Sequence, residues 1–416
     1  MADMAWWDDE EVLRRFISDL VAAEVALLRP TGASLPQRPW RNDTHIVRDL
    51  GVDSLELLAI ASALAEALHL QESGIEDYLL ARPTMEDWIA VAHAGLQRFS
   101  ERLTFTTSGS TGTPKRCTHP AAILLQEARE LAALFPARRR ILSAVPSHHI
   151  YGFIFTILLP RMLGLSCVPV IDLRGSSPAA LARELRDGDL VIGHPEFWRA
   201  AVRLLPSMPA GVMGVTSTAP CPDDVSIALV HAGMETLVQI YGSSETAGVG
   251  WRVRATDQYR LLSHWERIDG QPGALKRRHA DGRREVIACR DTLAWKDARA
   301  FLPTGRIDDA VQVGGINVFP AKVRHALMQH PDVFDASVRL MRADEGNRLK
   351  AFIVPRHPDA DLAGLRIRLE AWALTHLATP ERPKAFTFGY RLPTNAAGKH
   401  ADWALSPDTQ GMADCK

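Results

Sequence analysis

The ten residues TTSGSTGTPK, Thr106–Lys115, form the most informative segment of this chain. Small hydroxyl residues surround Gly109 and Gly112, and a lysine follows. Glycine allows a backbone to approach a ligand closely, and serine and threonine supply short hydroxyl donors. Such a loop can wrap a row of phosphates while Lys115 neutralises charge. The Gly-Lys-Ser/Thr ending of a Walker loop is absent, and an ordinary Gly/Ser/Thr turn is the alternative.

Composition indicates an ordinary globular protein of two to four domains. The chain has 416 residues, of which 46% are hydrophobic and 23% charged. Its five cysteines form no CxxC pair, which favours a reducing compartment and argues against a zinc site. The acidic start lacks the basic region of a signal peptide, and the apolar run at 150–160 is too short to cross a bilayer. We therefore expect a cytoplasmic protein without a membrane span.

Charge is distributed unevenly along the chain. The net charge is −1, but residues 1–95 carry 17 Asp and Glu against 7 Arg and no Lys. An acidic block joined to a basic one indicates two modules that can attract each other. The basic part has no concentrated Lys/Arg stripe with interleaved aromatic residues, so we expect no nucleic-acid partner.

The acidic block is expected to be helical. Apolar residues recur at helical spacing over 8–28, a second helix is expected from Ser54 to about Leu70, and a third begins at the capping sequence Thr84–Asp87 and runs to about Gln97. Beyond residue 100, strands expected at 103–107, 141–146 and 189–193 alternate with helices, as in an α/β domain.

Two motifs resemble known families. The loop TTSGSTGTPK resembles the phosphate loop of the adenylate-forming superfamily, which includes acyl-CoA synthetases and peptide-synthetase adenylation domains. The string DLGVDSLELL at 49–58 resembles the prosthetic-group site of acyl and peptidyl carrier proteins, in which a serine carries phosphopantetheine. This implies that Ser54 is modified by a phosphopantetheinyl transferase, at a helix N-terminus suited to a phosphodiester. Plain helix capping by Asp53 and Glu56 is the alternative.

Further motifs of the adenylate-forming superfamily follow in order. His149, in PSHHIYG, falls on a histidine beside the acyl pocket, where it would orient the carboxylate; a satisfied loop histidine is the alternative. YGSSE at 241–245 resembles the Tyr-Gly-x-Thr-Glu element, in which Tyr241 would stack on adenine and Glu245 would hold Mg²⁺; a surface turn is the alternative. The nucleotide-binding residues implied by the resemblance are Thr107, Ser108, Gly109, Ser110, Thr111, Gly112, Lys115, Tyr241, Gly242, Ser244, Asp291 and Arg306.

The last motifs imply a mobile C-terminal subdomain. Gly305–Asp309 resembles the hinge, with Asp308 as its pivot, and Gly314 and Gly315 would enter when the thiol reacts. Lys399, in PTNAAGK, would bind the carboxylate and the α-phosphate as charge develops. Lys322 and Arg324 stand near where the family often has a glutamate, and could dock an acidic carrier.

These motifs imply a multi-domain chain: a helical carrier bundle (1–97), an α/β adenylating core (103–308), a small α+β lid (309–405) and a flexible tail (406–416). A substantial α/β stretch normally precedes the phosphate loop in this family. The core therefore looks truncated, and a partner or a homodimer could cover the exposed sheet edge.

The expected activity is ATP-dependent adenylation of a small carboxylic acid, with ATP and Mg²⁺, followed by transfer to phosphopantetheine on Ser54 or on a partner carrier. The ligase part is similar to short adenylating enzymes of aryl polyene pathways, which favours an aryl acid over a fatty acid. The alternatives are an acyl-CoA ligase that uses free CoA and a non-enzymatic carrier or scaffold with a decayed ligase half.

Overall fold

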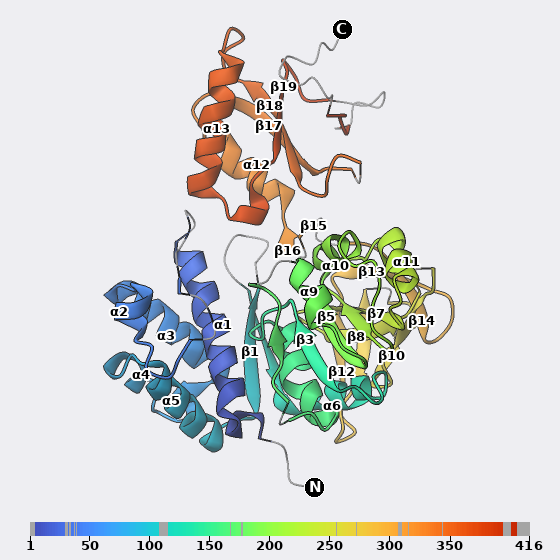
Figure 1. The fold of residues 1–416 in the computed structure, drawn as a ribbon. Coiled ribbons are helices and arrows are strands. Elements are labelled where there is room, and N and C mark those ends of the chain that lie inside the picture. The colour runs from blue at the N-terminus through green and yellow to red at the C-terminus, as the bar shows by residue number, and fades with distance from the viewer. Residues whose placement is uncertain are drawn as a thin grey trace. The chain divides into compact units, whose positions relative to one another are not determined.

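The computed structural model describes residues 5–405, except 30, 31, 33, 34, 37, 39, 108–114, 167, 176, 177, 255, 272, 307–309, 315, 343 and 394–400. These residues form two compact units, which we describe separately (Figure 1). The first contains the described residues of Met1–Leu28, Ser34–Thr107 and Lys115–Gly305. The second consists mainly of those of Arg306–Lys416.

The first unit begins with helices, as the sequence predicts. The α-helices of this segment are α1 (Glu10–Leu28), α2 (Ile46–Leu50), α3 (Ser54–Leu68), α4 (Tyr78–Ala81) and α5 (Met85–Arg98). Asp53 caps α3 by accepting from the backbone N–H groups of Leu55 and Glu56, and Glu56 accepts from the Asp53 N–H in return. Thr84 caps α5 by accepting from the Asp87 N–H. Ser54 is exposed at the first position of α3.

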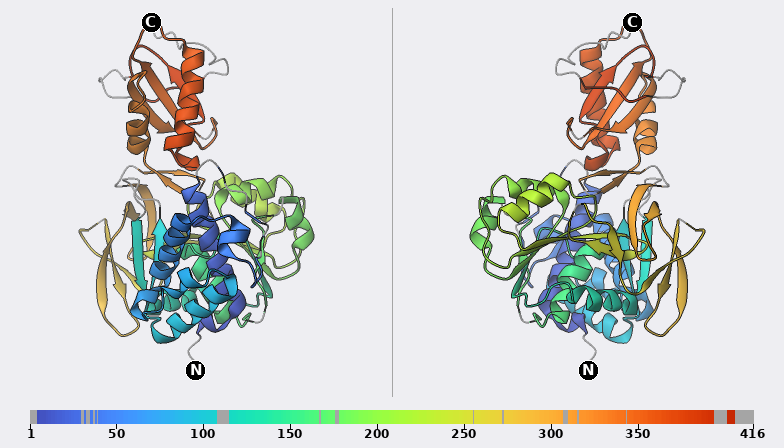
Figure 2. Two further views of the ribbon diagram at one scale, coloured as in Figure 1. Left: turned by 90° about the vertical axis from the view of Figure 1, so that its left-hand side faces the viewer. Right: turned by 90° about the vertical axis from the view of Figure 1, so that its right-hand side faces the viewer.

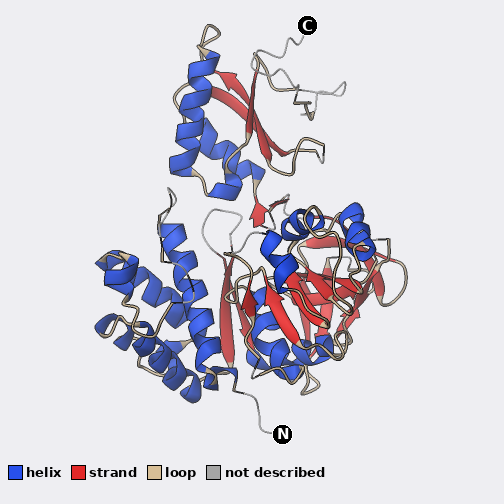
Figure 3. Cartoon of the chain, in the orientation of Figure 1, coloured by secondary structure: helices blue, strands red, loops and turns tan. Residues whose placement is uncertain are grey.

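A nine-stranded mixed sheet forms the core of the first unit (Figure 3). Its strands are β3 (Arg140–Ser143), β4 (Ile171–Asp172), β5 (Asp189–Gly193), β6 (Met213–Thr216), β7 (Thr236–Ser243), β8 (Ala247–Arg252), β9 (Tyr259–Leu261), β13 (Asp291–Trp295) and β14 (Ala300–Arg306). They lie in the order β13-β14-β9-β8-β7-β6-β5-β3-β4. The neighbours from β4 to β7 pair in parallel, whereas β7, β8, β9 and β14 pair antiparallel.

Helices cover both faces of this sheet (Figure 2). The helices that follow the N-terminal segment are α6 (Ala121–Ala132), α7 (Ile150–Phe153), α8 (Leu159–Met162), α9 (Pro178–Glu184), α10 (Pro195–Val202) and α11 (Asp223–His231). Leu181, Trp198 and Leu229 of α9–α11 pack with Val191 and Leu237 of the sheet in one buried cluster. Every residue of β5 is buried, which is typical of a parallel strand covered on both sides.

The N-terminal helices pack directly on this core. A π-helical turn at Ile154–Leu158 joins α7 to α8. Pro160 lacks the N–H that would reach the Thr156 carbonyl in an α-helix, and the Arg15 guanidinium of α1 donates to that carbonyl instead. The rings of Trp6 and Phe16 also lie against Phe153, with centroids 5.1 and 6.0 Å away. Residue 97 is therefore not a boundary between compact units, contrary to the expected division of the chain.

Two smaller sheets complete the first unit. The antiparallel hairpin of β1 (Arg102–Thr107) and β2 (Lys115–Pro120) brackets the glycine-rich loop, and Thr107 pairs with Lys115 at the end next to that loop. Helix α3 covers this hairpin: His69, just after α3, hydrogen-bonds Thr104 at 3.0 Å, and Glu66 pairs with Arg116 at 2.6 Å. The other sheet contains β10 (Trp265–Arg267), β11 (Ala274–Arg278) and β12 (Arg284–Ala288).

The second unit has an α+β fold. Its elements are β15 (Val311–Val313), β16 (Ile316–Val318), α12 (Pro320–Met328), β17 (Val333–Leu340), β18 (Leu349–Pro355), α13 (Leu362–His376) and β19 (Ala385–Phe388). Strands β17, β18 and β19 form a sheet, and its buried residues pack with those of both helices. The unit begins at Arg306, next to the expected hinge, whose pivot Asp308 lies outside the described residues.

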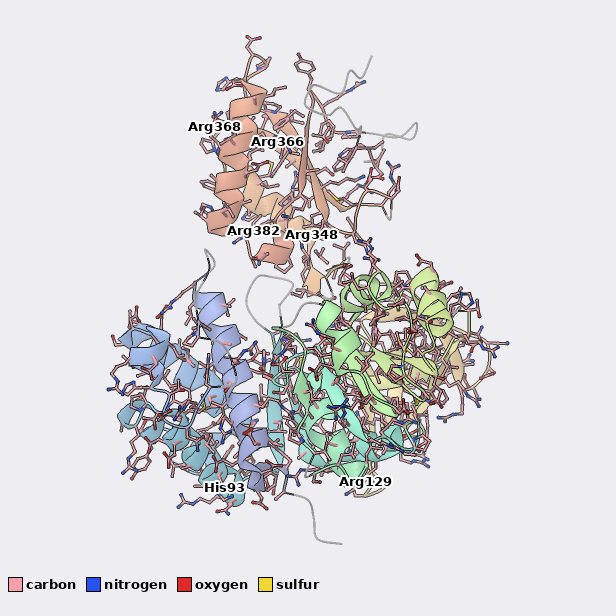
Figure 4. The ribbon with its side chains drawn as sticks, viewed as in Figure 1. His93, Arg129, Arg348, Arg366, Arg368 and Arg382 are labelled. Carbon is pink, nitrogen blue, oxygen red and sulfur yellow. The ribbon has the colours of Figure 1, made fainter. Side chains whose placement is uncertain are left out.

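Four basic residues of the second unit have carboxylate partners within it. Lys322 lies 2.6 Å from Glu381, and Arg324 lies 2.7 Å from Asp335. Arg366 and Arg368 lie on α13 (Figure 4) and pair with Glu370 and Asp332. Lys322 and Arg324 already have carboxylate partners, which weakens the expectation that they dock an acidic carrier. Over the described part of the chain, no helix combines the length and apolarity needed to span a bilayer.

Candidate active site

A tight turn between β7 and β8 carries the YGSSE motif. The Ser243 N–H donates to the Thr246 hydroxyl oxygen at 3.0 Å, and the Thr246 N–H donates to the Ser243 hydroxyl oxygen at 3.3 Å. A β-carbon at Gly242 would lie 2.1 Å from the Ala247 carbonyl oxygen, so only glycine fits there. The turn therefore presents Ser244 and Glu245 from a rigid base.

Glu245 is the centre of a charged cluster. Its Oε1 lies 2.5 Å from Lys115 Nζ and 3.1 Å from Arg290 Nε. Burial by itself would raise the pKa of Glu245, but the hydrogen bond and the charge of Lys115 lower it to about 2. The carboxylate is therefore ionised at neutral pH, and Lys115, at the base of the glycine-rich loop, meets the YGSSE turn in this structure.

His119 of β2 joins the same two segments from the buried side. Its Nε2 lies 2.6 Å from the Ser244 carbonyl oxygen, which can only accept, so Nε2 carries the proton. Burial lowers the pKa of His119, which favours the neutral ring. This bond holds the hairpin that brackets the phosphate loop against the turn that carries Glu245.

Tyr241 and Asp291 form the second half of the cluster. The Tyr241 hydroxyl donates to Asp291 Oδ2 at 2.7 Å, and the Tyr241 ring lies against Tyr259 and Phe301, with centroids 5.6 and 5.3 Å away. Asp291 begins β13 and directly follows Arg290. The residues expected to hold adenine and ribose thus lie beside those expected to hold the phosphates.

Two buried side chains, Glu127 and Arg277, support the turn from behind. Glu127 of α6 accepts from the Gly248 N–H with both carboxylate oxygens at 3.0 Å. Arg277 lies 4.0 Å from Glu127 and donates to the Thr246 carbonyl at 3.1 Å and the Ile123 carbonyl at 2.9 Å. Both side chains are almost fully buried. Burial raises the pKa of Glu127 to about 8, despite the charge of Arg277 and the Gly248 N–H.

His149 precedes the short helix α7, which lies near β8, the strand after the YGSSE turn. Its ring centroid is 4.2 Å from that of His148, and its side chain keeps an exposed surface. The surrounding protein lowers its pKa through desolvation, which Asp19 opposes and Arg174 reinforces. Among the described residues, no hydrogen bond or ion pair is seen between His149 and Glu245, Lys115 or Arg290, so its expected role near the acyl group stays a prediction.

Several predicted residues fall outside what the structure describes. They are Ser108, Gly109, Ser110, Thr111, Gly112, Asp308, Gly315 and Lys399. Of the others, Arg306 ends β14. Gly314, with φ of 59°, forms part of the turn between β15 and β16, where that backbone conformation favours glycine.

The donor set fits a magnesium ion bound together with phosphates. Glu245 supplies an ionised carboxylate, and Mg²⁺ is usually held by one or two carboxylates plus substrate phosphates and water. In the described ranges, no group of three or more His, Cys, Asp or Glu could hold a metal without such a substrate. The site therefore suits a metal that arrives with a nucleotide.

The motifs did not reveal several residues of this cluster. The sequence did not predict a role for Arg290, although it adjoins Asp291, because its position does not show which residue its side chain contacts. Three further residues belong to no motif: His119, Glu127 and Arg277. Their contacts with Ser244, Gly248 and Ile123 span 121 to 154 residues of sequence. The one available indication was that Glu127 falls at helical spacing with the apolar residues Ile123 and Leu131 of α6.

Comparison with known proteins agrees with this geometry. The pattern of the AMP-binding enzyme family matches residues 62–271, starting inside α3, and that of the AMP-binding enzyme C-terminal domain matches residues 322–399. A 4-coumarate–CoA ligase of Cereibacter sphaeroides is 39% identical over 413 residues, or 95% of this chain and 97% of that protein. Another from Halorhodospira halophila is 39% identical over 396 residues, or 94% and 98%.

Solved structures share the fold. An amide bond synthetase from Marinactinospora thermotolerans has a TM-score of 0.58 at 20% identity, over 93% of this chain and 92% of that one. A malonyl-CoA ligase with methylmalonyl-CoA and AMP bound has a TM-score of 0.56 at 25% identity, over 70% and 71%. None of these matches points to a carrier domain or to aryl polyene enzymes. The chain therefore belongs to the family of AMP-binding enzymes and is an adenylate-forming acid–thiol ligase.

Proposed function

We propose that this protein activates a hydroxycinnamate-type aryl acid such as 4-coumarate with ATP and transfers the acyl group to coenzyme A. The observation that carries this proposal is the meeting of Lys115, Glu245 and, through Tyr241, Asp291 in one cluster. The relatives named 4-coumarate–CoA ligase, which align with nearly the whole chain, support this choice of acid and thiol.

Each group in the cluster has a defined task. Tyr241 would stack on adenine, Asp291 would accept from the ribose hydroxyls, and Lys115 would bind phosphate oxygens. Mg²⁺ held by Glu245 would screen the triphosphate charge. A carboxylate oxygen of the acid attacks the α-phosphorus and the bond to pyrophosphate breaks. The sulfur of CoA then attacks the acyl carbon, and AMP leaves.

Residues outside this cluster complete the proposal. We assign His149 to orient the acid, Lys399 to the adenylating step, and Gly314 and Gly315 to the thiol step. Replacing Lys399 by alanine should slow adenylation about 100-fold or more, because it removes a charge used in the transition state. Thioester formation from supplied acyl-adenylate should be nearly unchanged.

Transfer to a phosphopantetheine arm on Ser54 is the alternative. Ser54 is exposed at a capped helix N-terminus, where a phosphodiester could be attached. However, the helices around it pack on the core of the first unit, and the Asp53–Glu56 capping box accounts for the motif without modification. These observations favour free CoA as the acceptor.

The two acceptors can be separated with purified protein. Pyrophosphate exchange across a panel of aryl and fatty acids tests adenylation, and product analysis with CoA identifies the thiol. We expect Ser54→Ala to leave both reactions unchanged. We also expect the intact mass of the wild-type chain to show no added group after treatment with a phosphopantetheinyl transferase and CoA. Exchange with no acid would contradict the function, whereas loss of acyl transfer in Ser54→Ala would favour the carrier.

A further inference from the structure

The position of Arg290 is set by its neighbours on both sides. The Cys289 N–H donates to the Gly273 carbonyl at 2.8 Å, and the Cys289 side chain is buried. Asp291 accepts from the Tyr241 hydroxyl at 2.7 Å. Because both flanking residues are anchored, the backbone of Arg290 has little freedom, and its side chain lies next to the nucleotide cluster.

Arg290 and Lys115 share one carboxylate oxygen. Both bind Oε1 of Glu245, although Lys115 begins β2 and Arg290 directly precedes β13. All three side chains keep solvent access, with exposed fractions of 41% for Arg290, 38% for Lys115 and 24% for Glu245. These three side chains together therefore carry one more positive than negative charge, at a surface that a ligand can reach.

We propose that Arg290 is a binding residue for the β- and γ-phosphates of ATP, which it contacts after releasing Glu245. This inference rests on the proposed function, because it assigns a further residue to the same nucleotide site. A guanidinium carries five N–H donors, and the Glu245 contact engages only Nε. When Glu245 binds a metal, the two cations lose their partner and can turn to the triphosphate, whose charge they complement.

The geometry favours the phosphates over the nucleoside as the ligand of Arg290. Tyr241 and Asp291 form the side of the cluster suited to adenine and ribose. Lys115, at the base of the glycine-rich loop, forms the phosphate side. Arg290 meets Glu245 at the same oxygen as Lys115, so its charge lies on the phosphate side. Arginine binds phosphate oxygens with charge-assisted and often paired hydrogen bonds.

Calorimetric titration of the full chain with Mg-ATP and with AMP tests this assignment. We expect Arg290→Gln to weaken ATP binding about 10- to 100-fold, because a charge-assisted contact is lost, and to change AMP binding less than about threefold. The ATP affinity of Arg290→Lys should fall between those of the wild type and Arg290→Gln. Arg284→Gln removes an exposed arginine of β12 and should change neither affinity.

The possible results are distinct. If Arg290→Gln weakens the binding of ATP and AMP equally, Arg290 is a structural support for Asp291. If the variant binds ATP more tightly, Arg290 only competes with the metal for Glu245. Either result overturns the assignment. AMP binding close to wild type shows that the variant is folded. If the wild type exchanges pyrophosphate and Arg290→Gln binds ATP normally, this inference is wrong but the proposed function stands. A wild type that binds no ATP would overturn the proposed function as well.

Discussion

Asp19 of α1 accepts two hydrogen bonds from Ser147, one from its backbone N–H at 2.7 Å and one from its hydroxyl at 2.8 Å. Ser147 directly precedes His148 and His149. The other carboxylate oxygen of Asp19 pairs with Arg174 at 2.6 Å and Arg38 at 2.7 Å. The first helix of the chain therefore holds the segment that leads into α7, more than 100 residues later in the sequence.

Replacing Asp19 by alanine should destabilise the first unit strongly. The change leaves the buried Ser147 N–H and hydroxyl without their acceptor, which typically costs about 1–3 kcal/mol for each unsatisfied group, and it leaves Arg174 with Asp172 as its remaining carboxylate partner. Urea denaturation measures this loss. Asp43→Ala is the matched control, because the Arg41–Asp43 pair is highly exposed and should contribute less than about 1 kcal/mol. Equal effects of the two substitutions would contradict the role of Asp19.

Removing residues 1–98 should prevent the rest of the first unit from folding. The shortened chain would expose the Phe153 face that Trp6 and Phe16 cover, and would leave the Thr156 carbonyl without Arg15. We expect loss of cooperative thermal unfolding, followed by circular dichroism. If residues 99–416 melt cooperatively near the temperature of the full chain, the helical segment is an independent module, as a carrier would be.

Glu127 should make stability depend on pH. Its pKa is raised from 4.5 to about 8 in the folded protein, so the fold holds this proton more tightly than the unfolded chain. Unfolding then releases the proton between these pH values, and the free energy of unfolding falls as pH rises, by up to about 1.4 kcal/mol per unit. Between pH 5.5 and 8, we expect the wild type to lose stability relative to Glu127→Gln.

The neighbouring Glu130 provides a control of opposite sign. Burial opposes the shift, but bonds to His264 and Ser263 lower its pKa, so its stabilising contribution is present at neutral pH and lost as the solution becomes acidic. Glu130→Gln should therefore lose stability mainly at neutral pH. Parallel stability curves for the wild type and Glu127→Gln would show that Glu127 is ionised throughout.

Lys350 should anchor the chain that follows the Lys399 motif. It is fully buried, lies 2.7 Å from Glu345 and 3.0 Å from Asp402, and donates to the Trp403 carbonyl at 2.5 Å. Lys350→Met leaves Glu345 with Arg342 as its remaining cation and the Trp403 carbonyl without its donor, at a typical cost of about 1–3 kcal/mol in the second unit.

Because residues 401–405 lose this anchor, we also expect slower adenylation in Lys350→Met, measured by pyrophosphate exchange. The exposed Lys384 offers a control, since Lys384→Met should change neither stability nor exchange. Normal exchange in a destabilised Lys350→Met would restrict the role of Lys350 to folding.

Local sequence alone predicted four residues of the proposed nucleotide site. Short motifs identified Lys115, Tyr241, Glu245 and Asp291, because phosphate and nucleotide binding demand particular residue types at short spacing. The structure then places these four in one cluster. Helices α1, α3 and α5 were likewise predicted from periodicity and caps, which act over a few residues.

Only the tertiary structure decided what the N-terminal helices do and which side chains complete the cluster. An amphipathic helix pattern is the same whether the apolar face packs in a free bundle or on a neighbouring sheet, so the sequence fits both a carrier and a part of the core. Arg290, Glu127 and Asp19 acquire their roles from partners that are distant in sequence. Such pairings depend on how the chain folds back on itself, and no local pattern records them.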